Sequence, residues 1–186
     1  MSKLLTLFSS WGYVDESNRK IVIYGLERIK NLFIDLLIAI LCGLVMENLI
    51  AALLFELTFI SLRIFAGGYH AQSEKICKLI SWGSIVGSMS VVIYLPCSET
   101  FWHILTILSF IGVMTLEPVE NKNKPLSMTE KKIFRRRSII IVIMEGGIYL
   151  FFTITEYILY AKVICVAILL VVVGLLLEVF RYYKSS

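Results

Sequence analysis

The stretch ILYAKVICVAILLVVVGLLLEVF, residues 158–180, decides the fold because it is long enough and apolar enough to cross a bilayer. A transmembrane helix needs about 20 predominantly apolar residues. An unbroken apolar run indicates a helix, whereas a strand of a membrane barrel would alternate apolar and polar residues. The sequence therefore predicts a membrane-spanning helix over these residues.

The composition of the whole chain agrees with this prediction. Hydrophobic residues make up 58% of the sequence, charged residues 17%, and the mean hydropathy is +0.83, which excludes a soluble domain with a polar surface. Five further apolar stretches lie near residues 32–46, 49–65, 79–95, 101–116 and 139–155. Since the bilayer core offers no water to backbone groups, we expect an all-α, polytopic membrane bundle of six transmembrane helices.

A four-span alternative stays open because the first two apolar stretches carry Asp35 and Glu56, so one hairpin can lie in the interface. Residues 1–30 are too charged to span and lack the pattern of a signal peptide. They are expected to form an N-terminal amphipathic segment on the cytoplasmic face, or a solvated leader that only sets topology. Residues 31–186 then form a single membrane domain, with a basic loop at 117–138.

The Lys and Arg residues predict the orientation of these helices. If both termini lie in the cytoplasm, all but one of the 18 Lys and Arg residues fall on the cytoplasmic side, and only Lys162 lies outside. Such an excess of positive charge is what the positive-inside rule describes. We therefore expect a multi-pass membrane protein whose segment 63–78 faces the cytoplasm.

The four cysteines do not indicate a disulfide framework. Cys42 and Cys165 lie within apolar stretches, and Cys77 falls on the reducing side of the expected topology. We interpret Cys42, Cys97 and Cys165 as small apolar filler. No pair of cysteines has zinc-ligand spacing, so neither a metal nor another cofactor is expected.

Cys77 differs from the other cysteines because His70 precedes it by seven residues. An imidazole that accepts the thiol proton leaves a reactive thiolate, which is the minimum set for nucleophilic catalysis. On one continuous helix the two residues would be separated by a rise of about 10.5 Å, so the chain between them has to bend. Gly67 and Gly68 can end one helix and Ser73 can cap the next, with Cys77 in or just after its first turn. The alternative is an amphipathic connector in which His70 and Cys77 only pack at the interface.

A third group should orient the histidine, and the sequence leaves open which one. Acidic residues inside membranes are functional candidates by default. The candidates here are Asp35, Glu56, Glu74 and Glu145. A hairpin that turns near residues 47–48 would bring Asp35 level with Arg63, which predicts an ion pair between them. Equally, Arg63 can meet a lipid phosphate or a substrate.

Arg63, the run Gly67-Gly68-Tyr69-His70-Ala71 and Cys77, followed by further apolar stretches and a basic loop, closely resemble the accessory gene regulator B (AgrB) family of membrane peptidases. The resemblance extends along essentially the whole chain. It implies a thiol endopeptidase of the bacterial cell membrane that trims an AgrD-like precursor, the first step in making a cyclic autoinducing peptide for quorum sensing. It also implies a homodimer, with Cys77 as nucleophile, His70 as general base, and Arg63 and Gly68 as supporting residues.

The basic cluster of the expected 117–138 loop has two interpretations. Its members are Lys131, Lys132, Arg135, Arg136 and Arg137. They can anchor the loop against anionic membrane lipids, or they can capture the acidic part of an AgrD-like precursor. Nucleic-acid binding is not expected, because the cluster is short and lies against the bilayer.

The competing class is a non-enzymatic membrane protein, either a peptide transporter or a subunit that binds and exports the peptide. Intramembrane acids such as Glu56 and Glu145 also occur in transporters. Cleavage of a precursor would identify an enzyme, and an intact precursor would identify a carrier.

Overall fold

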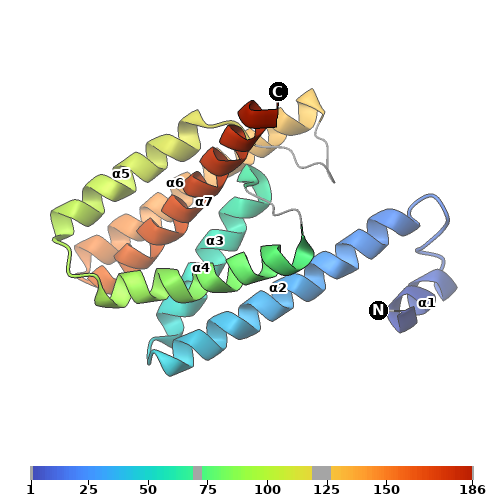
Figure 1. Ribbon diagram of the computed structural model, residues 1–186, viewed down its shortest axis with the longest axis horizontal. Coiled ribbons are helices and arrows are strands. Elements are labelled where there is room, and N and C mark those ends of the chain that lie inside the picture. Colours follow the sequence, from blue (N-terminus) through green and yellow to red (C-terminus); the bar gives the residue numbers. More distant parts are fainter. Residues whose placement is uncertain (1, 69–72, 119–126, 186) are drawn as a thin grey trace. The chain divides into compact units, whose positions relative to one another are not determined.

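The computed structural model describes residues 2–68, 73–118 and 127–185, and within them all regular secondary structure is helical (Figure 1). This confirms the all-α prediction. The helices in chain order are α1 (Ser2–Ser10), α2 (Arg19–Val45), α3 (Leu49–Ala66), α4 (Glu74–Tyr94), α5 (Glu99–Thr115), α6 (Met128–Ile154) and α7 (Ile158–Ser185).

The chain divides into two compact units, residues 1–38 and residues 39–186. In the first unit, a turn between α1 and α2 is closed by Asp15 and Asn18, each of which accepts the backbone N–H of the other at 2.9 Å or less. Hydrogen bonds from the Ser17 hydroxyl and the Asn18 backbone lower the pKa of Asp15. The helices expected within residues 1–30 are thus α1 and the start of α2, which continues unbroken to Val45 because no proline interrupts it.

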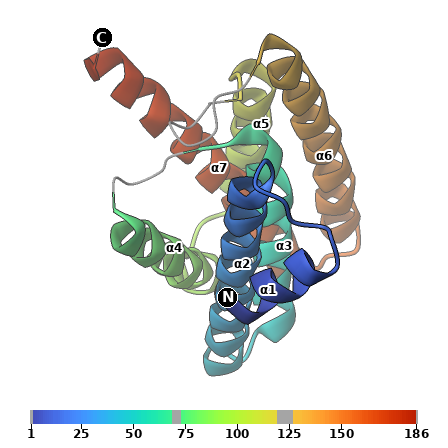
Figure 2. The same ribbon diagram turned by 90° about the vertical axis from the view of Figure 1, so that its right-hand side faces the viewer.

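Helix α7 is the centre of the second unit, because it contacts α3, α4, α5 and α6 (Figure 1, Figure 2). Residues Ile164, Ile168, Val171 and Leu175 of α7 are almost completely buried. Their spacing of three and four residues defines one face of a helix, and further buried residues extend the contact around it. The most apolar stretch of the sequence therefore forms the core against which the other helices pack.

The turn between α2 and α3 depends on a close approach of the two helices. The turn lies at residues 46–48, as expected, and Glu47 adopts a left-handed φ of 54°. A Cβ atom at Gly43 would lie 2.8 Å from Leu49 Cα and 2.9 Å from Ala52 Cβ. The absence of a side chain at Gly43 therefore lets the hairpin close.

Four helices are long and apolar enough to cross a membrane, namely α3, α4, α6 and α7. The sequence predicted six spans, and by length and composition alone the described residues offer four. Helix α5 has 17 residues, a length of about 25 Å, which is shorter than a hydrocarbon core of about 30 Å. Every 18-residue stretch of α2 contains at least three charged residues, Arg28, Lys30 and Asp35, which is more than any of the four candidate spans carries in its most apolar part.

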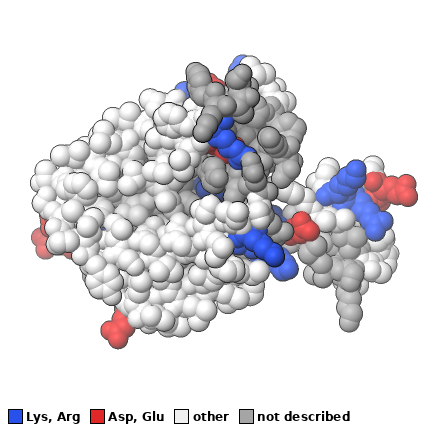
Figure 3. Space-filling model, viewed as in Figure 1, with Lys and Arg blue, Asp and Glu red and all other residues white. Residues whose placement is uncertain are grey.

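The chain is thus a helical membrane protein. Figure 3 shows a broad surface without charged side chains over the helices of residues 39–186, with Lys and Arg gathered toward one end of it.

The expected loop at 117–138 is partly helical, and α6 begins at Met128. A capping box starts this helix: the Ser127 side chain accepts the Glu130 backbone N–H, and the Glu130 carboxylate accepts the Ser127 backbone N–H. The basic cluster therefore lies on the first turns of α6, and not in a flexible connection. The prediction of a loop up to residue 138 was wrong because it followed the apolar stretches alone. The charged residues at the start of α6 belong to the same helix as the apolar stretch after them.

We expect Gly43→Ala to lower the stability of the helical bundle. The added methyl group would overlap the backbone at Leu49, and overpacking of this kind costs about 1–3 kcal/mol. The midpoint of thermal unfolding of the detergent-solubilised protein measures the effect. Gly83→Ala is the matched control, because a Cβ at that helical glycine meets no atom within 4 Å. Equal midpoints for the two variants would contradict the interpretation.

Candidate functional site

The chain bends at the two glycines, as the sequence predicted. Helix α3 ends at Ala66, and the N–H of Gly67 donates to the Arg63 carbonyl oxygen at 3.0 Å. Gly67 and Gly68 have φ angles of 81° and 137°, which L-residues with a side chain rarely adopt. The helix can therefore end here without a strained residue.

Helix α4 begins at Glu74 and carries Cys77 just after its first residues. Ser73 occupies the N-cap position in an extended conformation, but its side chain accepts no capping hydrogen bond. The N–H of Cys77 donates to the Ser73 carbonyl oxygen at 3.0 Å, which is the first helical hydrogen bond of α4. The predicted start of the helix is thus confirmed, while the predicted cap by the Ser73 side chain is not formed.

Arg63 is held in place at the end of α3. Its guanidinium lies over the Phe59 ring, 5.3 Å from the ring centroid, in a cation–π contact. On another side it lies against Gly68, where a Cβ would come within 3.1 Å of Arg63 Nη1 and 3.7 Å of the Gly174 carbonyl carbon. Gly68 therefore allows the chain after α3 to pass between the guanidinium and the backbone of α7.

Arg63 and Cys77 line the same cavity, which has a volume of about 90 Å³. Residues from α3, α4 and α7 form its wall: Phe59, Ile80, Ser81, Ser84, Leu170, Val173, Gly174 and Leu177 complete the lining. The Cys77 side chain is half-buried, whereas Cys42 and Cys165 are buried, in agreement with their expected role as filler. A cation and a thiol thus share one small, largely apolar space.

Two of the other predicted site residues cannot be placed in this cavity. His70 lies outside the described residues, so its contact with Cys77 stays a prediction. Asp35 belongs to the unit of residues 1–38 and Arg63 to the unit of residues 39–186. The predicted ion pair between them therefore also stays a prediction.

Glu145 makes a contact between two helices. Its Oε1 atom accepts a hydrogen bond of 2.8 Å from the Ser61 hydroxyl, which joins α6 to α3 two residues before Arg63. The side chain is buried, and its Oε2 atom has no hydrogen-bond partner among the described residues. Glu145 is not part of the cavity lining, and its suggested role in orienting His70 stays a prediction.

A family model described as Accessory gene regulator B matches residues 2–180. The chain belongs to the AgrB family. A putative AgrB-like protein of Clostridium perfringens (strain SM101 / Type A) is 30% identical over 174 residues, which are 86% of this chain and 77% of that protein. The accessory gene regulator protein B of Staphylococcus intermedius is 26% identical over 126 residues, 68% of this chain and 58% of that protein. No solved structure matches the chain.

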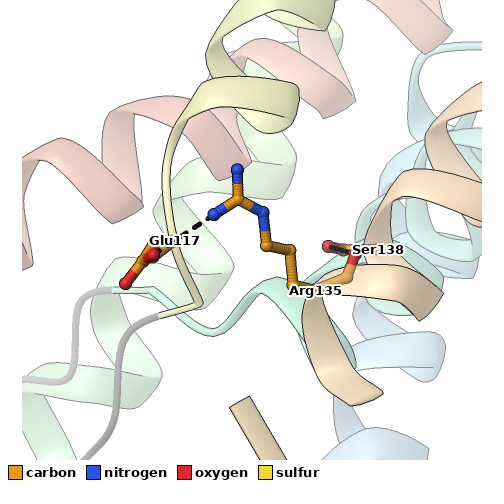
Figure 4. Close-up of polar contacts among 3 residues, drawn as sticks. All are labelled: Glu117, Arg135 and Ser138. Carbon is orange, nitrogen blue, oxygen red and sulfur yellow. Dashed lines mark hydrogen bonds and ion pairs between the residues drawn. The ribbon is translucent and has the colours of Figure 1, made fainter. Parts of the chain in front are cut away.

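In this AgrB family member, two residues of the basic cluster, Arg135 and Arg137, contact neighbouring segments of the chain. Arg135 Nη1 lies 3.2 Å from Glu117 Oε1, and the Ser138 hydroxyl donates to the Arg135 carbonyl oxygen at 2.9 Å (Figure 4). The Arg137 guanidinium lies 5.3 Å from the centroid of the Phe65 ring, near the end of α3. These contacts fix the start of α6 beside the segment that leads to Gly67.

Sequence reasoning missed the part of the cavity wall that α7 supplies. Leu170, Val173, Gly174 and Leu177 are about 100 residues from Cys77 in the chain, and no motif joins them to it. A usable signal did exist on α4, because Ser81 and Ser84 follow Cys77 by four and seven residues and therefore share its helix face.

Among the described residues, no three His, Cys, Asp or Glu side chains gather into a group that could hold a metal ion. The imidazole of His103 contacts the Tyr149 hydroxyl, with 2.6 Å between Nδ1 and Oη.

We expect Ser61→Ala to destabilise the bundle by about 1–3 kcal/mol, because it removes a hydrogen bond from the buried Glu145 carboxyl. The double variant Ser61→Ala/Glu145→Leu should recover most of this loss, since both polar partners are then gone. Thermal unfolding in detergent is the measurement. Ser109→Ala is the control, because the buried Ser109 hydroxyl bonds only the Leu105 carbonyl of its own helix. A double variant no more stable than Ser61→Ala would refute the assignment.

Proposed function

We propose that this AgrB family member is a membrane-embedded cysteine endopeptidase that cleaves an AgrD-like precursor of an autoinducing peptide. Family membership supports the proposal. The structural observation that carries it is the cavity shared by Cys77 and Arg63, beside the bend at Gly67 and Gly68. His70 follows this bend in the sequence and is assigned as general base.

The chemistry follows from the residue types. His70 takes the proton of the Cys77 thiol, and the thiolate attacks a backbone carbonyl carbon of the precursor. The carbon–nitrogen bond then breaks, the leaving amine receives the proton from His70, and the peptide remains on sulfur as a thioester. A thiol or hydroxyl of the same peptide can next attack the thioester, which closes a thiolactone or lactone ring and frees Cys77. The Arg63 guanidinium lines the same cavity as this thiol.

The reaction is assigned to the cytoplasmic side of the bacterial cell membrane. Lys75, Lys78, Arg181 and the basic cluster of α6 belong to helix ends that share this side in the six-span topology that the positive-inside rule predicts, in which α2 and α5 also cross. The basic cluster then has the position to meet anionic lipid or the acidic part of the precursor. Arg135 already bonds Glu117, so an acidic peptide would have to replace a carboxylate that this chain itself provides.

The first test of the proposal is cleavage. Co-expression with an AgrD-like precursor should yield a shortened peptide by mass spectrometry, and Cys77→Ala should abolish it because no other group supplies the nucleophile. Cys97→Ala is the matched control: Cys97 is also a half-buried free thiol, but it lies between α4 and α5 and outside the cavity. Full cleavage by Cys77→Ala would refute the assignment of Cys77 as nucleophile. An intact precursor with the unaltered protein would favour a carrier.

The second test is orientation. Variants that retain a single cysteine are treated in protoplasts with a membrane-impermeant maleimide, before and after permeabilisation. We expect the variant with only Cys97 to be labelled in intact protoplasts, and the variant with only Cys77 to be labelled only after permeabilisation, because the two thiols lie near opposite ends of α4. A variant without cysteines gives the background. Labelling of Cys77 in intact protoplasts would overturn the cytoplasmic assignment.

A further inference from the structure

The cavity next to Cys77 is a slot between α4 and α7, to which α3 adds Phe59 and Arg63. Cys77, Ser81 and Ser84 occupy one face of α4, at intervals of four and three residues. Leu170, Gly174 and Leu177 occupy one face of α7 at similar intervals, and Val173 lies beside them. The thiol is at the end of the slot nearest the start of α4.

The wall of the slot is mostly apolar. Phe59, Ile80, Leu170, Val173 and Leu177 supply aliphatic and aromatic surface. The Ser84 hydroxyl already donates to the Ser81 carbonyl oxygen of its own helix at 2.7 Å, so its proton is not available to a ligand. With Arg63, Cys77 and Ser81 as its other polar lining residues, the slot is mostly apolar and favours an apolar occupant.

Gly174 lines the slot on the α7 side, and the chain at Gly68 passes close to its carbonyl carbon. The volume of about 90 Å³ is smaller than the cavity that accepts benzene in an engineered protein, about 150 Å³. The space therefore suits a branched aliphatic side chain better than an aromatic one.

Covalent geometry says which part of a peptide would occupy the slot. When the Cys77 sulfur is bonded to a carbonyl carbon, the Cα of that residue is the next atom, and its side chain begins within about two bond lengths of the sulfur's partner. The slot is an apolar space that the Cys77 side chain itself lines. We propose that this slot is the specificity pocket for the aliphatic side chain of the residue whose carbonyl Cys77 attacks. The inference rests on the proposed function.

A set of affinity labels tests the pocket separately from peptide cleavage. N-acetyl amino-acid chloromethyl ketones place a chosen side chain next to a reactive carbon, and the thiolate displaces chloride to form a sulfur–carbon bond. Membranes containing the protein are treated with the leucine, alanine and phenylalanine reagents, and mass spectrometry follows alkylation at Cys77. Each rate is divided by the rate with iodoacetamide, which has no amino-acid side chain. We expect the leucine reagent to react about tenfold faster than either of the others, within the range for hydrophobic pockets.

Two variants alter the slot in opposite directions, each with a matched control. Ser84→Leu fills it and should remove the advantage of the leucine reagent, while Ser90→Leu should not, because Ser90 makes a similar hydroxyl contact on α4 but lies outside the lining. Leu177→Ala enlarges the slot and should raise the phenylalanine rate several-fold. Leu176→Ala is its control, because Leu176 is also partly exposed on α7 but is not a lining residue.

The outcomes separate the two proposals. The pocket proposal is refuted if the three reagents have equal normalised rates, even if the precursor is cut. It is also refuted if each slot variant shows the same pattern of rates as its control. Equal rates are also the result expected if a lipid chain fills the slot. A clear leucine preference that Ser84→Leu removes supports the pocket, and if no precursor is cut in the same membranes, only the proposed function fails.

Discussion

The arrangement of this protein depends on Gly68, which lies between the Arg63 guanidinium and the backbone of α7. The chain leaving α3 passes between the Arg63 guanidinium and α7, where a Cβ at Gly68 would come within 3.1 Å of the arginine. The φ angle of 137° at the same residue also excludes most side chains. Both restrictions have one consequence: α3 ends, α4 starts in a new direction, and Cys77 joins Arg63 at one cavity.

Burial then limits how the polar groups near this bend can be arranged. In an apolar bundle a polar side chain needs a partner inside the protein, since lipid provides none. Arg63 has the Phe59 ring on one face, and Ser61 has the Glu145 carboxylate across the interface with α6. Both contacts involve the last two turns of α3. The Ser61–Glu145 hydrogen bond therefore joins the end of α3 to α6, while the Phe59 ring, one turn earlier on α3 itself, holds the guanidinium.

The sequence predicted local features well where a single physical cause dominates. Apolar runs predicted helices, paired glycines predicted the end of α3, and the turn at residues 46–48 followed from the gap between two apolar stretches. Errors arose where two causes compete. Helix α6 begins with a charged segment, and its capping box and helix-forming residues outweigh its polarity. Helix α5 is apolar but has only 17 residues, so length and hydropathy give different answers on whether it spans.

By itself, the sequence determined that this is a helical membrane protein, and it singled out Cys77 and Arg63, because hydrophobicity, glycine freedom and thiol chemistry are properties of the residues themselves. Only the tertiary structure decided that α7 forms the core and that Leu170, Val173, Gly174 and Leu177 form one wall of the cavity at Cys77. The physical reason is that packing brings together residues about 100 positions apart in the chain. By composition alone, several apolar helices could occupy the central position that α7 takes. The side chains and small residues that let α7 fit against α3 and α4 become apparent only when the helices are placed together.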